Sequence, residues 1–311
     1  MRASRSAWST PTLELDNLVD VQHVCQVGAE LGEGPVWVER EAALWFVDIK
    51  ARRAHRWHPG RRQLRSWAAP EQPGFIAPLR GDGFIVGLKT GLQRFDPGTS
   101  QFVHLLAVEP DRPGNRLNDG SVSPEGQLWF GSMHDPEVEP TGALYRLDTD
   151  GRCVRLDEGF VIGNGPAFSP DGRTFYYTDT TERTVYAFDR PDPHTLAGKR
   201  IFVRIEDGAG HPDGTTVDQE GCVWIALWGG SAVRRYSPEG KIVATVRLPC
   251  ANVTKIAFGG PELRTAYVTT AWKGLTREQR TAQPLAGDLF SFAAPAPGLR
   301  AAEVHLNPTG S

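Results

Sequence analysis

An apolar triplet recurs six times along the chain and constrains its fold more than any other feature. The six copies are rich in aromatic and β-branched residues, and they lie at residues 44–46, 84–86, 128–130, 175–177, 223–225 and 266–268. Their central residues are separated by 40, 44, 47, 48 and 43 positions. A repeat of this length indicates one structural unit per copy, with several units packing together to bury a shared core.

Each copy also carries the signature of several short strands. The triplets follow turn sequences such as SPEG and SPDG, and a second alternating run comes after each of them, as at residues 54–57 and 144–147. Aromatic and β-branched residues bounded by Gly, Pro and Asp are typical of strands. No window shows a sustained helical period. Six such units predict an all-β, six-bladed β-propeller. A linear stack of repeats is the alternative, but the aromatic content and sharp turns favour a closed ring.

The two ends of the chain suggest how the ring closes. Residues 19–27 have the pattern of a lone strand ahead of the first full unit. We expect this N-terminal strand to complete the blade that holds residues 266–292, because closure leaves no open sheet edge. The expected organisation is a poorly ordered extension over residues 1–20, the propeller over residues 21–295, and a C-terminal tail over residues 296–311.

Composition excludes several classes of function. The 37 acidic and 34 basic residues leave a formal charge of −3 without a basic stripe, so we expect no nucleic-acid partner. The four cysteines have no CxxC spacing, which disfavours a zinc knuckle or a redox pair. No segment resembles a membrane span or a signal peptide. We therefore expect a cytoplasmic protein, a monomer or small homo-oligomer, that acts on a small molecule and has no membrane partner.

Polar residues stand directly before glycine where the innermost strands of three units would begin. They are Glu33, Asn164 and Asp213. Innermost strands line the central channel, so these side chains would converge at one mouth of it. Two carboxylates and an amide oxygen suit Ca²⁺, Mg²⁺ or Mn²⁺ and, less typically, Zn²⁺ or Fe²⁺. Without a cation the acids would repel each other and their pKa values would rise. Taken singly, an acid such as Glu33 is more often a solvated turn residue.

The third unit contains the densest polar cluster in the sequence, within residues 115–136. Arg116, Asn118 and Asp119 precede Gly120 there, and in isolation such a run is a turn. The equivalent positions of the other units favour a place in the channel instead. The second unit has the apolar segment 73–78 at this point, which predicts a pocket wall and no ligand.

Several motifs on this repeat resemble one known family. LGEGPVW, NRLNDGSVSPEGQLWFGSM, IGNGP, PDGTTVDQEGCVWIALW and FGG occur in this order. The chain resembles the gluconolactonase / senescence marker protein / luciferin-regenerating enzyme family over about residues 21–295. FVDIK, VGLKTG, TGALYRLD, ALWGG and NVTK make it most similar to bacterial aldonolactonases of pentose catabolism, such as xylono-lactonases.

The resemblance implies a function and a set of site residues. It implies one divalent metal ion held by Glu33, Asn164 and Asp213, and a substrate contacted by Arg116 and Asn118, followed by the matching Asp119. The implied reaction is hydrolysis of a sugar lactone, a pentonolactone above all, and Asp213 is our candidate general base. Gluconolactonase activity, promiscuous esterase activity and a non-catalytic calcium-binding propeller are the alternatives.

One departure from the family pattern concerns the loop after Met133. Some relatives carry acidic residues at this place, where this chain has His134, Asp135 and Pro136. We therefore leave His134 out of the site and the role of this loop open. The absence of a G-x-S-x-G motif disfavours an acyl-enzyme route.

Overall fold

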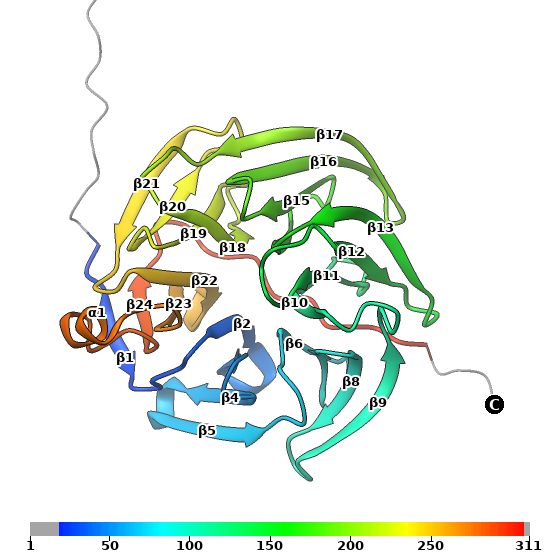
Figure 1. The fold of residues 1–311 in the computed structure, drawn as a ribbon, viewed down its shortest axis with the longest axis horizontal. Helices are drawn as coiled ribbons and strands as arrows, with labels where there is room; N and C mark the ends of the chain where they lie inside the picture. Colours follow the sequence, from blue (N-terminus) through cyan, green and yellow to red (C-terminus); the bar gives the residue numbers. More distant parts are fainter. Residues whose placement is uncertain (1–18, 308–311) are drawn as a thin grey trace, which may run out of the picture.

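The computed structural model describes residues 19–307 and shows six four-stranded antiparallel sheets arranged around a central axis (Figure 1). This confirms the predicted all-β, six-bladed propeller. The proposed extension over residues 1–20 lies almost entirely outside the described residues. In the described part of the chain, α1 (Arg277–Ala282) is the single α-helix, and three short 3-10 helices occupy turns. These are η1 (Glu39–Glu41), η2 (Pro59–Arg61) and η3 (Pro261–Leu263).

Each blade is numbered in chain order and runs from its innermost to its outermost strand. Blade 1 contains β2 (Gly32–Val38), β3 (Ala43–Asp48), β4 (Arg53–His58) and β5 (Gln63–Ala68). Blade 2 contains β6 (Phe75–Pro78), β7 (Phe84–Leu88), β8 (Gly91–Asp96) and β9 (Gln101–Ala107). Blade 3 contains β10 (Asn115–Val122), β11 (Leu128–His134), β12 (Gly142–Leu147) and β13 (Cys153–Phe160). Blade 4 contains β14 (Gly163–Phe168), β15 (Thr174–Asp179), β16 (Thr184–Asp192) and β17 (Thr195–Arg204). Blade 5 contains β18 (His211–Val217), β19 (Val223–Trp228), β20 (Ala232–Tyr236) and β21 (Ile242–Arg247). Blade 6 contains β22 (Asn252–Gly259), β23 (Thr265–Ala271), β24 (Leu289–Ala293) and β1 (Gln22–Cys25).

The last blade is built from both ends of the chain, as predicted. β1 pairs antiparallel with β24, and Gln22 lies opposite Ser291. Asp288 strengthens this junction, because its Oδ1 accepts hydrogen bonds from the backbone N–H groups of Val27 and Gly28 at 2.8 and 2.9 Å. The N-terminal strand therefore closes the ring.

The repeated triplets form the packing between blades. The tryptophans at the centres of three of them, Trp45, Trp129 and Trp224, are completely buried. The Trp45 ring lies 4.3 Å from that of Phe84 in the next blade, centroid to centroid, and 5.0 Å from that of Trp67. Large aromatic surfaces buried in this way supply much of the packing energy of a core.

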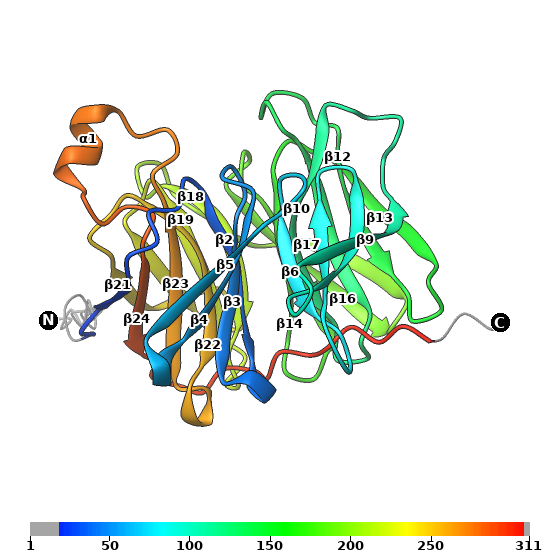
Figure 2. The same ribbon diagram turned by 90° about the horizontal axis from the view of Figure 1, so that it is seen from below.

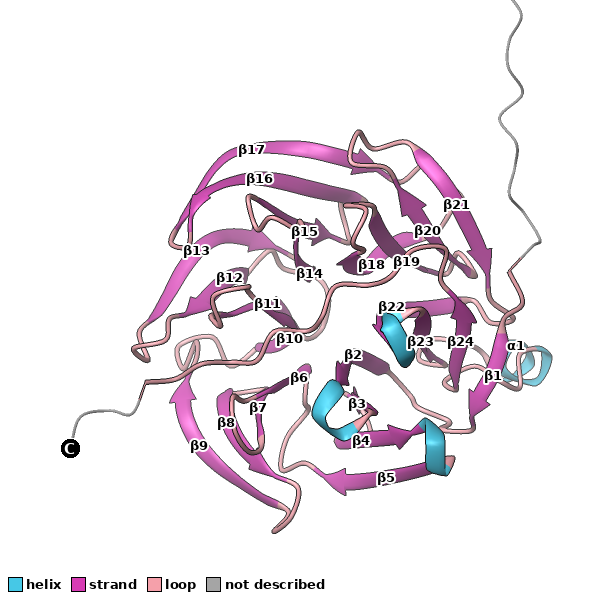
Figure 3. Ribbon diagram, turned by 180° about the vertical axis from the view of Figure 1, so that it is seen from behind, coloured by secondary structure: helices cyan, strands magenta, loops and turns pink. Residues whose placement is uncertain are grey.

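A C-terminal strap, residues 297–307, runs across one face of the ring (Figures 2 and 3). At one end the carbonyl of Pro297 accepts a hydrogen bond from Gln219 in blade 5. Farther along, Val304 exchanges backbone hydrogen bonds with Pro78 and Arg80 in blade 2, and it is 1% exposed. The part of the predicted tail that the structure describes is thus packed against the propeller.

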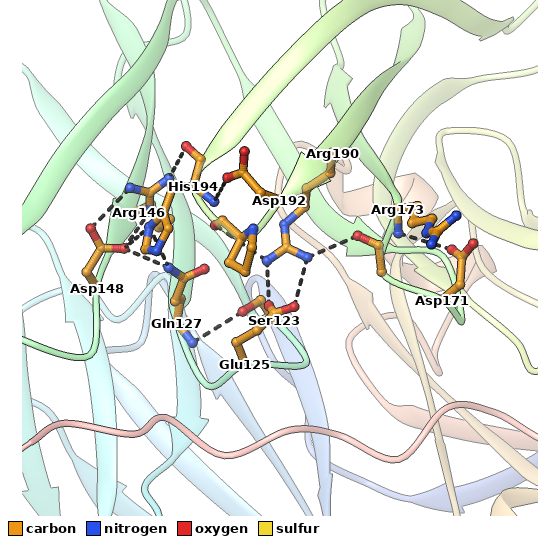
Figure 4. A network of polar contacts seen from close by, with 12 residues as sticks. Ser123, Glu125, Gln127, Arg146, Asp148, Asp171, Arg173, Arg190, Asp192 and His194 are labelled. Atoms are coloured by element: carbon orange, nitrogen blue, oxygen red, sulfur yellow. Dashed lines mark hydrogen bonds and ion pairs between the residues drawn. The ribbon is translucent and has the colours of Figure 1, made fainter.

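An arginine network joins blades 3 and 4 (Figure 4). Arg146 binds the Asp148 carboxylate through Nε and Nη2 at 2.6 and 3.1 Å, and Arg190 pairs with Glu125. Both guanidinium groups lie over the ring of Trp129, at 5.6 and 5.7 Å from its centroid. The paired charges hold neighbouring blades together, while Arg190 Nε and Gln127 Oε1 are buried without a hydrogen-bond partner among the described residues.

No helix between residues 19 and 307 has the length and apolar character needed to cross a bilayer. All four cysteines are free thiols.

Candidate active site

Breaks in strand register place the predicted residues at the central channel. The innermost strands of four blades lose register with their neighbours at equivalent points, namely between Glu33 and Val36, Leu117 and Gly120, Asn164 and Ala167, and Pro212 and Thr215. A bulge re-aims the side chains beside it and is common next to functional sites. The polar residues found from the sequence therefore lie at, or directly beside, bulges that turn them out of the regular ladder.

The glycines that follow these polar residues let adjacent blades approach closely. Gly34 and Gly165 have φ values of +55° and +53°, which residues with a Cβ rarely adopt. A Cβ on Gly165 would lie 2.6 Å from the backbone nitrogen of Thr215 in blade 5. The polar–glycine pairs of the sequence thus reflect tight packing around the axis.

One cavity of about 260 Å³ gathers most of the predicted site. Glu33, Arg116, Asn118, Asn164 and Asp213 all line it. Residues 299–302 of the strap line a second cavity, together with residues at the other end of the same innermost strands.

Two of the three carboxylates that line this pocket, Glu33 and Asp213, are buried and have few partners. Glu33 is 6% exposed and accepts one hydrogen bond, from the backbone N–H of Gly34 at 3.0 Å. Asp213 is 5% exposed, and within residues 19–307 its carboxylate accepts no hydrogen bond. Burial, together with the negative charge of Asp119, raises the pKa of Glu33 to about 8. Burial and the negative charge of Glu33 raise the pKa of Asp213 well above its ordinary value.

A chain of hydrogen bonds links the amide residues across three blades. Asn118 Nδ2 donates to Asn164 Oδ1 at 2.8 Å, and Asn164 Nδ2 donates to Thr180 Oγ1 at 2.9 Å. Thr180 Oγ1 in turn donates to the carbonyl of Pro212 at 2.8 Å, directly before Asp213. This chain fixes the orientation of both amides relative to Asp213, and it leaves Asn164 Oδ1 one further lone pair for a ligand.

Arg116 is held so that one nitrogen remains available. Its Nε donates to Asp135 Oδ1 at 3.0 Å, and its Nη1 donates to Asn118 Oδ1 at 2.7 Å and to the Leu117 carbonyl at 3.1 Å. Nη2 has no hydrogen-bond partner among the described residues. Burial lowers the pKa of this guanidinium, and the negative charges of Asp135 and Glu137 oppose that shift. Arg116 can therefore donate to a molecule in the pocket from a fixed position.

The loop after Met133, which we left without a role, supports the pocket. Asp135 binds Lys50 Nζ at 2.8 Å as well as Arg116. His134 Nδ1 accepts hydrogen bonds from the backbone N–H groups of Val138 and Glu139, at 3.3 and 2.9 Å. His134 thus shapes the loop, and Asp135 orients the arginine.

Asp119 occupies a different place from the other predicted residues. Its two oxygens lie 2.5 and 2.7 Å from Lys255 Nζ, and they also accept hydrogen bonds from the backbone of Gly120 and Gly165. Asp119 is 2% exposed and does not line the pocket. It joins blades 3, 4 and 6, so contact with a substrate would require this buried ion pair to open.

Several pocket residues escaped the sequence analysis. Lys273 and Glu137 line the pocket from loops that have no local motif. Lys255 does not line the pocket, but its pairing with Asp119 could have been suspected from a charge within an apolar strand. The apolar segment 73–78 of the second unit does not line this pocket, but its residues Ile76, Ala77 and Pro78 line the second cavity. The ring of Phe75 packs instead against Gly87 and Gly120, in the core between blades 2 and 3.

The donor chemistry of the pocket fits a divalent cation. Within residues 19–307 no three His, Cys, Asp or Glu side chains form a potential metal cluster, so the third donor would have to be an amide. Glu33, Asp213 and Asn164 offer such a set, with hard oxygen donors. The lysines that lower the pKa of Asp213, Lys255 and Lys273, are each paired with another acid.

Comparison with known proteins agrees with this fold. The model of the SMP-30/Gluconolactonase/LRE-like region matches residues 31–272. The chain is 35% identical to a 6-deoxy-6-sulfogluconolactonase of Pseudomonas putida, over 86% of this chain and 92% of that protein. It is 36% identical to an L-arabinolactonase of Azospirillum brasilense, over 90% of this chain and 94% of that protein. The crystal structure of a calcium-binding protein, regucalcin, from Agrobacterium tumefaciens superposes with a TM-score of 0.89 at 29% identity, covering 93% of this chain and 98% of that one. The chain belongs to the SMP-30/gluconolactonase/LRE-like family of sugar lactonases and regucalcins.

Proposed function

We propose that this protein hydrolyses a sugar lactone to the corresponding aldonic acid with the help of one divalent cation. The observation that carries the proposal is the pair of buried carboxylates, Glu33 and Asp213, neither of which forms an ion pair with a basic side chain within residues 19–307. Two buried acids with raised pKa values beside a buried arginine are typical of a functional site. The lactonases among the relatives support the same reaction.

Glu33, Asn164 and Asp213 would hold the cation, with Ca²⁺, Mg²⁺, Mn²⁺, Zn²⁺ and Fe²⁺ as candidates. A cation bound there would supply Lewis-acid polarisation of the lactone carbonyl, worth several kcal/mol of transition-state stabilisation. Asp213 would take a proton from the attacking water and return it to the ring oxygen as the C–O bond breaks. Arg116 would donate from Nη2 to a substrate oxygen.

The two remaining predicted residues, Asn118 and Asp119, would have different roles. Asn118 donates both amide hydrogens, to Gly163 and Asn164, and its Oδ1 accepts from Arg116 Nη1, so one lone pair of Oδ1 is left for a substrate hydroxyl. Asp119 would hold the backbone of Gly165, and thus Asn164, in place. We therefore propose Asp119 as a positioning residue.

A pentonolactone is the substrate that we propose. The likeness to an L-arabinolactonase supports it, whereas the likeness to a 6-deoxy-6-sulfogluconolactonase supports a six-carbon lactone. Metal-free protein should be reconstituted with each cation in turn and assayed for acid release from a panel of pentono- and hexonolactones. Fastest release from a pentonolactone would support the proposal, and no release with any cation and lactone would refute it.

Two substitutions separate the roles of the acids. Asp213→Asn keeps a carbonyl oxygen for the cation but cannot accept a proton, so saturating metal should restore occupancy without turnover. Loss of a general base costs on the order of 10²–10⁴-fold in rate. Glu33→Gln is the matched control, since metal should rescue it at least in part. Full rescue of Asp213→Asn would reduce Asp213 to a ligand.

A calcium-binding propeller without catalysis is the second candidate, because the regucalcin structure that superposes on this chain is described as a calcium-binding protein. Tight calcium binding together with no acid release from any lactone would favour it.

A further inference from the structure

An ion pair spans the pocket between opposite sides of the ring. Glu137 belongs to the loop between β11 and β12 in blade 3, and Lys273 belongs to the loop between β23 and α1 in blade 6. Blades 3 and 6 face each other across the axis (Figure 1). Both side chains line the pocket that contains Glu33 and Asp213, and Lys273 Nζ donates to Glu137 Oε1.

The backbone at each end of this pair is fixed. Glu137 has a φ of +63°, a conformation held by the hydrogen bond from its N–H to the His134 carbonyl at 2.9 Å. The backbone N–H of Lys273 donates to the backbone carbonyl of Glu30, and the backbone carbonyl of Lys273 accepts from Asn252 Nδ2, both at 2.9 Å. The two charged groups are therefore presented to the pocket from defined points, while their side chains can still adjust.

The pair contributes little to folding, which leaves it free to exchange partners. The side chains of Lys273 and Glu137 are 27% and 36% exposed, and ion pairs at such positions add little to stability. Lys273 Nζ also lies 5.9 Å from the ring centroid of Trp228, another pocket residue. An ammonium donor, a carboxylate acceptor and an aromatic face thus meet at one rim. A hydroxyl group both donates and accepts, so it can bind between the two charges.

We propose that Lys273 and Glu137 bind the terminal hydroxyl of the substrate, outside the lactone ring, and so determine specificity; this rests on the proposed lactonase function. The hydroxyl would donate to the Glu137 carboxylate and accept from Lys273 Nζ. A methyl group at the same place would separate the two charges and offer neither of them a hydrogen bond.

The test compares two lactones that differ in this one group. Wild type, Lys273→Met and Glu137→Gln are assayed on a lactone with a terminal hydroxymethyl group and on its deoxy analogue with a methyl group. Wild type should favour the hydroxymethyl lactone about tenfold or more in kcat/KM, as expected for hydrogen bonds to charged groups. The ratio should fall to about one in Lys273→Met and to an intermediate value in Glu137→Gln, because a neutral amide is the weaker acceptor.

Lys89→Met is the matched control. Lys89 Nζ lies 4.0 Å from Asp135 Oδ2, and Lys89 does not line the pocket. The substitution therefore removes a positive charge near the pocket without changing its lining. This variant should keep the wild-type ratio. An unchanged ratio in Lys273→Met, or an equal loss in Lys89→Met, would overturn the inference. If wild type opens neither of these lactones nor any other lactone of the panel with any of the candidate cations, the proposed function is refuted instead.

Discussion

Two groups of buried acids share the central channel, and they differ in what neutralises them. Asp119 is 2% exposed and has the Lys255 ammonium against both of its oxygens. Glu33 and Asp213 are 6% and 5% exposed, line a cavity, and have no such partner among the described residues. The blades therefore bury acids in two ways within one ring.

The difference separates a charge that supports the fold from the two charges that we propose to be functional. A buried carboxylate is tolerated when the protein itself provides an opposite charge and hydrogen bonds. Asp119 meets this condition and links three blades. Glu33 and Asp213 meet it only through protonation or through a cation from solution, which is why we assign the binding role to them.

Lys255→Met should have the largest effect on stability. It leaves Asp119 buried without an opposite charge, and loss of one partner of a buried pair costs about 3–5 kcal/mol of unfolding free energy. Urea denaturation measures this. The double variant Asp119→Asn/Lys255→Met should be less destabilised than Lys255→Met alone. If the unfolding free energy of Lys255→Met stays within about 1 kcal/mol of that of wild type, the pair contributes no more than a surface ion pair, and the two groups of acids do not differ as we describe.

The unpaired acids should make the metal-free protein less stable as pH rises. Glu33 has a pKa of about 8 in the folded protein, against an ordinary value of 4.5, and the pKa of Asp213 is also raised. The folded state thus binds more protons than the unfolded chain between about pH 4.5 and 8, and its stability falls as pH rises through this window. For Glu33 alone the loss should be on the order of 5 kcal/mol, because each unit of pKa shift corresponds to about 1.4 kcal/mol.

This loss is measured as a difference between variants. Chelator-treated wild type and Glu33→Gln/Asp213→Asn are unfolded with urea between pH 5 and 8. The double variant should lack the decline, and identical pH profiles would show that the acids are not a source of instability.

A bound cation should restore the folding stability that is lost when the unpaired acids ionise. A cation that binds only the folded state stabilises it by about 2.7 kcal/mol at 100 times its dissociation constant. We expect this gain at pH 8 and a smaller gain at pH 5, where protons compete for the same oxygens. Thermal unfolding with and without each cation tests this. Equal stabilisation of Glu33→Gln at equal metal concentration would place the cation elsewhere.

Lys273→Met should have the smallest effect on stability, since its ion pair with Glu137 is partly exposed. Such pairs contribute about 0–1 kcal/mol, so the unfolding free energy should stay close to that of wild type. Urea denaturation beside Lys255→Met gives the comparison directly. A loss as large as that of Lys255→Met would mean that the Glu137–Lys273 pair holds blades 3 and 6 together.

Much of the fold and part of the site could be predicted because they depend on local patterns. The six triplets indicated six blades, since alternating aromatic and β-branched residues form strands whatever their neighbours are. Residues 19–27 indicated closure, because a strand without a local partner must pair at an edge. The polar–glycine pairs at Glu33, Asn164 and Asp213 were visible because the bulges that turn these residues toward the channel need the glycine beside them.

The sequence by itself thus determined the ring, its closure and the polar residues that border the channel. Only the tertiary structure decided which acid is neutralised by the protein and which is not. Asp119 and Glu33 both precede glycine at an innermost strand, and nothing local distinguishes them. Lys255 lies 136 positions from Asp119, and Lys273 lies 136 positions from Glu137. Charges meet across the axis only once all six blades have closed, because the electrostatic energy of a side chain depends on distances in space, not on separation along the chain.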